Sequence, residues 1–178
     1  MTDTPPPETS SPEDPLTWSG LDLMTAILEG RHPRATMSGP IGFALSAVAD
    51  GRVAFRGTPT ADHLNPLGTV HGGWYGTLLD SAMTCAVSTR LPAGQAATTL
   101  EFKTGIVRAI PVGTEVEAVG IADHVGRSIG VARGELRGVA DGRLYATGST
   151  TCLVLRLPAT PPPSGPSPLP ASPRRGPA

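Results

Sequence analysis

The chain has 178 residues, of which 20 are proline and 39% are hydrophobic, and its net charge is −1. Five prolines fall in residues 1–16 and nine in residues 158–178, so 14 of the 20 lie in two short terminal segments. These segments contain almost no large apolar residues and cannot bury enough surface to offset the entropy cost of ordering. We therefore predict disordered Pro-rich tails at 1–16 and 158–178 and one folded domain at 17–157.

Charge and composition exclude several classes of protein. The only basic pair is Arg174-Arg175 and aromatic residues make up 4% of the chain, so no nucleic-acid-binding surface is indicated. No basic segment followed by an apolar stretch opens the sequence and no apolar run is long enough to span a bilayer, so we expect no signal peptide and no membrane association. Two cysteines are too few for a disulfide framework and fit the reducing cytoplasm. The histidines show no metal-ligand spacing and no nucleotide-binding loop is present, so we expect no metal and no cofactor.

The first elements are a helix and a hairpin. Apolar residues recur at helical spacing within Leu21–Glu29, which predicts a short amphipathic helix. Ile41–Val48 and Gly51–Thr58 are predicted strands, and the Asp-Gly pair between them is typical of a hairpin turn. Residues 59–70 are rich in Pro, Asn, Asp and Gly and are expected to form a loop.

The segment His71–Arg90 is the main helix candidate. Asp80 is its only charged residue before Arg90, and its other side chains are mostly apolar, small or hydroxyl-bearing. A helix this poor in charge is expected to be buried nearly all round.

The rest of the domain is predicted to be four strands, at Ala97–Ile106, Thr114–His124, Arg127–Val139 and Leu144–Leu155. Turn signals separate them, and the last two junctions are typical of tight antiparallel connections, so the four runs resemble a meander. An antiparallel sheet wrapped around one central helix satisfies this order, because each element covers the apolar surface of the other. The predicted fold class is therefore α+β.

Asp80 is the first candidate for a functional residue. A carboxylate inside a buried, otherwise uncharged helix costs on the order of several kcal/mol unless it is paired or used, and Asp is unfavourable in a helix interior. The alternative is an Asp that faces a solvated groove or caps neighbouring backbone. We favour a functional role.

His71-Gly72-Gly73 is the second candidate. A glycine pair at the start of a helix lets a ligand approach the backbone N–H groups at the positive end of the helix dipole. Such a place suits an oxyanion or a polarised carbonyl. A Gly-rich junction without any ligand is the equal alternative on spacing alone.

Gly126-Arg-Ser128-Ile-Gly130 matches the G-x-S-x-G pattern of serine hydrolases. The triad of that fold needs a histidine after the serine, and the last histidine here is His124. We therefore interpret Ser128 as an ordinary strand residue after a turn.

The segment Asn65-Pro-Leu-Gly68-Thr-Val-His71-Gly72-Gly73, followed by Asp80, resembles the hot-dog-fold thioesterases of the phenylacetic-acid-degradation PaaI type. Thr99-Leu-Glu101 looks like the Thr-x-Asp strand of that family with Glu in place of Asp, and Gly126-Arg127 resembles its Gly-Arg hairpin. The likeness covers roughly residues 20–155. It implies a hot-dog fold, an antiparallel sheet wrapped around a long central helix, and hydrolysis of acyl-CoA thioesters.

The resemblance also implies roles for individual residues. Asp80 matches the carboxylate that acts as nucleophile or as general base on water, and Gly72 matches the N–H that polarises the thioester carbonyl. Asn65 and His71 match supporting positions nearby. Thr99 matches a hydroxyl that orients the water or the carboxylate, a position that Thr98 would fill as the alternative.

The substrate itself needs further contacts. Gly73 belongs to the helix opening that receives the thioester, and the CoA phosphates need cationic partners, for which Arg127 and Arg108 are the candidates. The acyl group is not specified by the sequence.

The spacing of the two central groups predicts an oligomer. Gly72 and Asp80 are eight residues apart, or about 12 Å along a helix axis, whereas both must lie roughly 3 Å from one reacting thioester. A homodimer with antiparallel helices, in which Asp80 of one chain faces Gly72 of the other, is the simplest solution. The sites that the family shares between two chains agree with this homodimer. A dimer of dimers stays open as well.

Two other functions compete with acyl-CoA hydrolysis. A hot-dog dehydratase or hydratase uses a histidine with an acid in a different arrangement, whereas here His71 opens the helix and the acid lies inside it. A non-catalytic acyl-CoA-binding module would gain stability from an apolar residue in place of Asp80. We therefore favour hydrolysis.

Overall fold

The computed structural model describes residues 17–158. The predicted tails lie outside the described residues, apart from Pro158 at the boundary. The domain prediction of 17–157 stays a prediction, because nothing tests whether that segment folds and works alone.

The described part of the chain includes three α-helices and a short 3-10 helix. The predicted first helix is α1, Gly20–Leu28, and Ser19 caps it by accepting a hydrogen bond from the Asp22 backbone N–H. The one-turn helix α2, Ser38–Ile41, and the 3-10 turn η2, Ala61–His63, were not predicted. The long predicted helix is α3, Gly72–Ser88.

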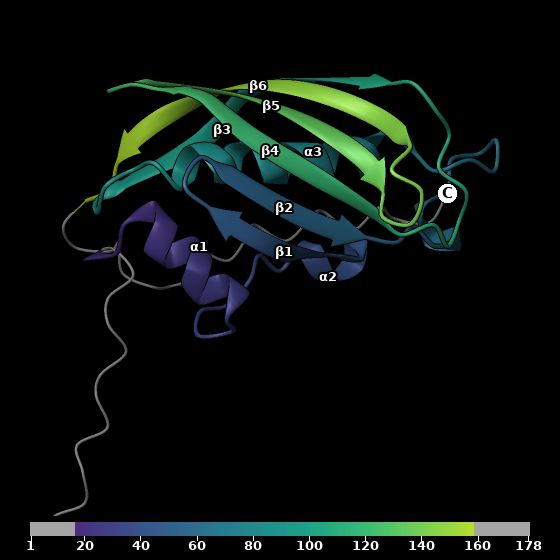
Figure 1. Ribbon diagram of the computed structural model, residues 1–178, viewed down its shortest axis with the longest axis horizontal. Coiled ribbons are helices and arrows are strands. Elements are labelled where there is room, and N and C mark those ends of the chain that lie inside the picture. The colour runs from purple at the N-terminus through teal and green to yellow at the C-terminus, as the bar shows by residue number, and fades with distance from the viewer. Residues whose placement is uncertain (1–16, 159–178) are drawn as a thin grey trace, which may run out of the picture.

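Six strands form one antiparallel sheet: β1 Phe43–Ala49, β2 Arg52–Gly57, β3 Gln95–Ile106, β4 Val116–Val125, β5 Ile129–Gly138 and β6 Leu144–Arg156. Their order in the sheet is β1-β2-β4-β5-β6-β3. The sheet curls over α3, which lies in its concave side (Figure 1). The predicted antiparallel sheet around one central helix is thus confirmed.

The Asp-Gly turns are where the sequence places them. Gly51 joins β1 to β2 and Gly142 lies between β5 and β6, each with a φ of 66°. This left-handed conformation carries no steric penalty for glycine, which is why Asp-Gly indicates such a turn.

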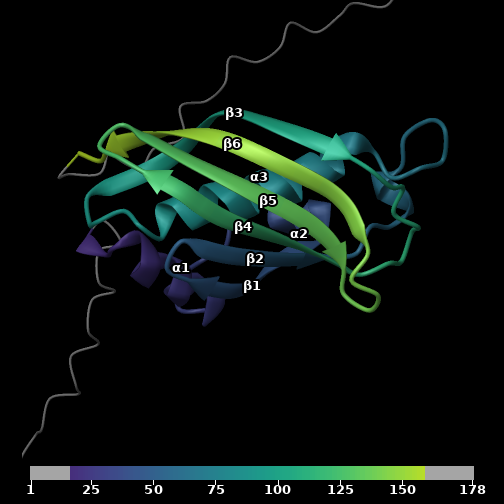
Figure 2. The ribbon, with the colours of Figure 1, turned by 45° about the horizontal axis from the view of Figure 1, so that its top comes forward.

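The predicted meander of four late strands is wrong for the first of them. Only β4, β5 and β6 follow one another as neighbours, whereas β3 pairs with β6 at the far edge of the sheet (Figure 2). The connection from β3 to β4 is no tight turn, and the Tyr75 hydroxyl on α3 accepts a hydrogen bond of 2.8 Å from the Ile110 backbone N–H within it. With β3 at that edge, α3 contacts β3 as well as β2, β4, β5 and β6.

The core lies between α3 and the concave face of the sheet. Leu78, Leu79 and Met83 of α3 are fully buried there. Gly120 on β4 faces the Ala82 backbone so closely that a Cβ at this position would overlap it. The helix therefore lies directly on the sheet.

The prediction that α3 is buried nearly all round is wrong for the single chain. A stripe of small and polar side chains stays partly exposed: Thr77, Asp80, Ser81, Thr84 and Ser88. Three of these hydroxyls, on Thr77, Ser81 and Ser88, donate to the carbonyl four residues earlier in the helix. These three hydroxyls are therefore satisfied within the helix itself.

Candidate active site

Asp80 lies on the partly exposed stripe of α3, next to β3. Its Oδ1 accepts hydrogen bonds from the Thr99 hydroxyl at 2.8 Å and from the Thr84 hydroxyl at 3.2 Å. The two threonine oxygens are themselves 2.9 Å apart. Within residues 17–158 no donor contacts Oδ2, so one carboxylate oxygen is held and the other is available to a water or a substrate.

The structure places Thr99, and not Thr98, beside Asp80. Thr99 is on the inner face of β3, whereas Thr98 is exposed. Thr84 was not singled out from the sequence. The signal was its position four residues after Asp80, which puts both side chains on one side of the helix.

An irregularity in β3 begins directly after Thr99. Thr99 pairs with Cys152 and Glu101 with Thr151, so Leu100 is an extra residue without a partner across the ladder. Such a bulge reverses which residues face inward, and Phe102 beyond it approaches Gly76 of α3. Glu101 is exposed, and its Oε1 accepts a hydrogen bond of 2.9 Å from Thr151. The carboxylate in the family-like Thr-x-acid pattern therefore does not reach Asp80.

The helix begins with a capped but open N-terminus. His71 is the N-cap residue, and its Nδ1 accepts a hydrogen bond of 2.9 Å from the Gly73 N–H. Gly72 is exposed, and no acceptor in the described part of the chain takes its N–H. His71 therefore supports the helix start, Gly73 is occupied by that cap, and the Gly72 N–H is available at the positive end of the dipole.

Asn65 holds the loop before the helix. Its Oδ1 accepts from the Leu67 N–H at 2.9 Å and from the Thr69 N–H at 3.2 Å, and its Nδ2 donates to the Thr69 hydroxyl at 2.8 Å. All three contacts are within five residues, as in an Asx turn. In the single chain Asn65 thus shapes the loop that leads into His71.

One chain does not bring all the predicted site residues together. Gly72 and Asp80 lie on the same helix, α3, about 12 Å apart along its axis. Arg127 is in the β4–β5 turn, near the start of β3, whereas Arg108 follows the end of β3. A strand of 12 residues spans about 40 Å, so the two arginines lie at opposite ends of the sheet.

Two thiols lie close to the candidate carboxylate. Burial raises the pKa of the Cys85 thiol to about 12, and the charges of Asp80 and Cys152 act in the same direction. The thiolate is the nucleophilic form of cysteine. Because Cys85 stays protonated near neutral pH, it does not compete with Asp80 as a nucleophile.

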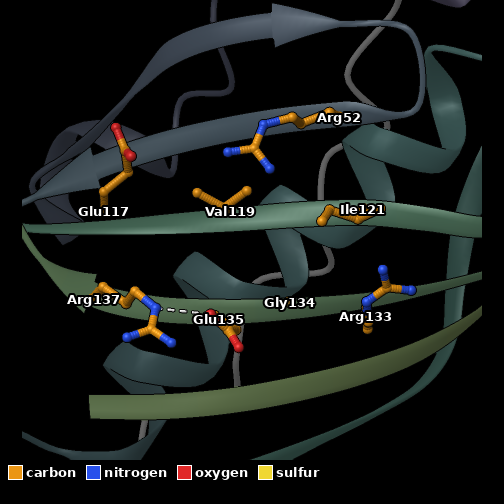
Figure 3. Close-up of a pocket in the computed structure, with 8 residues that line it drawn as sticks. All are labelled: Arg52, Glu117, Val119, Ile121, Arg133, Gly134, Glu135 and Arg137. Carbon is orange, nitrogen blue, oxygen red and sulfur yellow. Dashed lines mark hydrogen bonds and ion pairs between the residues drawn. The ribbon is translucent and has the colours of Figure 1, made fainter. Parts of the chain in front are cut away.

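A separate hollow of about 390 Å³ lies on the outer face of the sheet (Figure 3). Arg52, Arg133 and Arg137 surround a floor that includes Val119 and Ile121 (Figure 3). These side chains alternate along their strands with the residues buried against α3, so they point away from Asp80. The hollow is not part of the candidate site.

Residues 17–158 hold neither a membrane-spanning helix nor a metal cluster. None of the helices there is long and apolar enough to cross a bilayer. In the same part of the chain, no three His, Cys, Asp or Glu side chains gather in a way that would hold a metal ion.

The fold and the site together define a hot-dog domain, a curved antiparallel sheet around one central helix with a carboxylate on that helix. The family described as "Thioesterase superfamily" matches residues 67–145. The TT0310 protein from Thermus thermophilus is 30% identical and superposes with a TM-score of 0.62 over 68% of this chain and 98% of its own. The chain belongs to the thioesterase superfamily.

Two other solved structures extend the comparison. A mutant of the phenylacetic acid degradation protein PaaI from the same organism is 29% identical, with a TM-score of 0.61 over 67% of this chain and 98% of its own. A hypothetical thioesterase from Streptococcus pneumoniae, solved with coenzyme A, is 22% identical, with a TM-score of 0.61 over 68% of this chain and 92% of its own, and shows the fold alone. No curated protein matches the chain.

Proposed function

We propose that this protein hydrolyses acyl-CoA thioesters at sites shared between two copies of the chain. The observation that carries the proposal is the half-held carboxylate of Asp80, with Oδ1 fixed by Thr84 and Thr99 and Oδ2 left available. Membership of the thioesterase superfamily supports the reaction class. The coenzyme A in the Streptococcus pneumoniae structure supports the thiol half of the substrate.

A second copy is needed to complete the site. The Gly72 N–H and the Asp80 carboxylate cannot converge on one thioester from a single straight helix. Antiparallel packing of two α3 helices through their open stripes would bring Asp80 of one copy to Gly72 of the other. The small side chains of the stripe allow such a close approach.

The free edge of β3 supports the same arrangement. β3 pairs only with β6 among the described strands, and its other edge is open. Large apolar side chains on β3 are exposed: Leu100 at 56%, Phe102 at 45% and Ile106 at 48%. A long apolar edge strand is a template for pairing with another chain, so a second copy that packs on α3 would also cover this edge.

The proposed reaction begins with the thioester carbonyl at the N-terminus of one α3. Its oxygen accepts a hydrogen bond from the Gly72 N–H, which holds the negative charge that develops there. In one route, Asp80 Oδ2 attacks the carbonyl carbon, CoA thiolate leaves, and water hydrolyses the mixed anhydride. In the other route, Asp80 takes a proton from a water that attacks, and that proton leaves with the thiolate. Thr84 and Thr99 orient the carboxylate in both.

Single turnover in oxygen-18 water separates the two routes. Label in the Asp80 carboxylate, which enters when water attacks the Asp80 carbonyl of the mixed anhydride, excludes the general-base route, because that route labels only the product acid. Thiol release from a panel of acyl-CoAs tests the proposal itself, with Asp80→Asn as the comparison. A native protein that cleaves nothing in a broad panel would refute it, and a fully active Asp80→Asn variant would refute the assignment of the site.

Mixed dimers test whether the sites are shared. Gly72→Pro removes the N–H at a position where proline is tolerated, because Gly72 is the first helical residue and His71 before it is extended, with φ −63° and ψ 137°. Mixing inactive Gly72→Pro with inactive Asp80→Ala should restore some activity. Complete lack of rescue, with subunit exchange demonstrated, would contradict the shared site.

The competing functions are less well supported. His71 Nδ1 is occupied by the Gly73 N–H, which favours a structural role for this imidazole over the acid–base role that a dehydratase needs. A pure binding module has no use for a carboxylate held by two hydroxyls with its second oxygen available. Both cysteines are free, which fits the expected cytoplasmic location.

A further inference from the structure

A second pocket lies beside the candidate active site. It has a volume of about 250 Å³ and is enclosed by α1, the end of α3 and the start of β3, with walls that include Trp18, Leu23, Ser88, Ala97 and Leu157. We call it the α1 pocket. No Asp, Glu, Lys, Arg or His among the described residues lines it. An apolar cavity of about 150 Å³ can hold benzene, so this space is large enough for a phenyl ring or several methylene groups.

Two lines of residues connect the α1 pocket with Asp80. Along β3, Ala97 lies two residues before Thr99, or about 7 Å away on the same inner face. Along the open stripe of α3, Ser88 lies eight residues after Asp80, or about 12 Å. The pocket is therefore on the same side of the helix as the carboxylate.

The path between them presents little unsatisfied polarity. The Ser88 hydroxyl donates to the Thr84 carbonyl at 3.0 Å. The Thr84 hydroxyl lies within hydrogen-bond distance of both Asp80 and Thr99. With these hydroxyls engaged, an apolar chain held between this end of the stripe and the second copy leaves no buried polar group unpaired.

We propose that the α1 pocket binds the distal part of the acyl group, and that it selects medium-chain thioesters over acetyl thioesters. This inference rests on the proposed thioesterase function, because it assumes that the reacting carbon lies at Asp80. An acyl chain that starts there must cover about 7–12 Å before it enters the pocket. An acetyl group is too short to do so and gains nothing from the pocket.

The competing occupant is the loop of a second copy. The antiparallel register that pairs Asp80 with Gly72 also brings the partner's residues 64–68 toward the C-terminal end of α3. Leu67 in that loop is 88% exposed. If the partner's loop filled the pocket, substitutions there would change dimerisation and leave the preference for acyl length unchanged.

The test uses binding of two thioethers that cannot be hydrolysed, S-octyl-CoA and S-ethyl-CoA, measured by calorimetry on the full chain. Leu23→Trp narrows the pocket, Leu23→Ala widens it, and Leu28→Ala is the matched control because Leu28 is on α1 but is 40% exposed and outside the pocket. Native protein should bind S-octyl-CoA about tenfold or more tightly than S-ethyl-CoA, since each buried methylene adds to affinity. Circular dichroism and size-exclusion chromatography check folding and dimerisation of each variant.

Leu23→Trp should remove most of the preference for the octyl ligand and leave S-ethyl-CoA binding unchanged, whereas Leu28→Ala should behave as native protein does. If Leu23→Trp does not fold, Leu23→Ala serves instead, and the S-alkyl-CoA that it binds most tightly should have a longer alkyl chain than the one that native protein prefers. An unchanged octyl-to-ethyl ratio in the folded Leu23 variants, or no preference in native protein, overturns the proposal. A weakened dimer with an unchanged ratio assigns the pocket to the partner's loop and also overturns it.

Failure of the pocket and failure of the proposed function are distinguishable. If native protein hydrolyses acetyl-CoA and octanoyl-CoA but Leu23→Trp leaves their kcat/KM ratio unchanged, the pocket assignment is wrong and the thioesterase proposal stands. If no thioester is hydrolysed but the octyl preference depends on Leu23, the pocket stands as a ligand site and the thioesterase proposal is wrong.

Discussion

The hydroxyl of Thr99 is the group whose removal tests the proposed site most directly. Thr99→Val keeps the branched shape of the side chain and deletes the hydrogen bond of 2.8 Å to Asp80 Oδ1. It also deletes the contact with the Thr84 hydroxyl, leaving Thr84 as the one remaining donor to that oxygen among the described residues. The carboxylate then loses its stronger anchor and samples orientations that do not face the substrate.

The expected loss follows from the type of hydrogen bond. A hydrogen bond to a charged group contributes about 1.5–3 kcal/mol, and about 1.4 kcal/mol corresponds to a tenfold change in rate. If most of this free energy serves to orient Asp80 in the transition state, kcat should fall about 10- to 100-fold with little change in KM. Thr99→Ser keeps the hydroxyl and should retain most of the activity.

The assay is steady-state thiol release from one acyl-CoA, with Thr98→Val as the matched control. Thr98 is the neighbouring residue on β3 and is exposed, so its substitution should leave kcat within about twofold, as expected for a surface position. Because Thr84 and Thr99 bind each other and the same oxygen, Thr84→Val and Thr99→Val should be clearly non-additive. If Thr99→Val keeps the native kcat while Asp80→Asn loses activity, the hydrogen bonds from Thr84 and Thr99 do not orient Asp80.

Three other predictions concern stability and domain limits. Gly120→Ala places a methyl group against the Ala82 backbone and should lower the free energy of unfolding, measured in urea, by about 1–3 kcal/mol or more. Gly39→Ala is the control, because a Cβ at Gly39 meets nothing within 4 Å. Equal stability of the two variants would show that the helix–sheet distance does not limit the side chain at position 120. Burial raises the pKa of the Cys85 thiol from 9.0 to about 12 in the folded chain. Between these pH values the unfolded chain releases the thiol proton and the folded chain keeps it, so the free energy of unfolding should fall as pH rises above about 9. Cys85→Ala should make that fall shallower. A 17–157 truncation should fold and hydrolyse thioesters at the native rate, and a folded but inactive truncation would show that the tails contribute to function.

Local signals in the sequence were sufficient for the parts of the fold that depend on neighbouring residues. The turns at Gly51 and Gly142 have the positive φ that Asp-Gly indicates, and α3 begins at Gly72, directly after His71. Asp80 stood out for the same reason, because a single charge in a long uncharged helix is visible without any knowledge of contacts. Turn conformation and helix capping are decided within a few residues of chain.

The surroundings of Asp80 were only partly visible in the sequence. The family resemblance singled out Thr99, but Asp80 and Thr99 are 19 residues apart, and the helix and strand that carry them can meet in many registers. The bulge at Leu100, which separates the inward-facing Thr99 from the outward-facing Glu101, has no sequence signal of its own. Thr84 is an ordinary helix residue until Thr99 is placed opposite it.

The sequence by itself determined the two longer helices, the six strands, the Asp-Gly turns and the two groups at the start and middle of the long helix, because these depend on short-range spacing. Only the tertiary structure decided that β3 lies beside β6, that one oxygen of Asp80 is held and the other available, and that a stripe of α3 and an edge of the sheet stay open. The physical reason is that strand order and side-chain registry depend on contacts between residues far apart in the chain. Alternative pairings of these alternating strands satisfy local patterns equally well, and only packing against α3 distinguishes them.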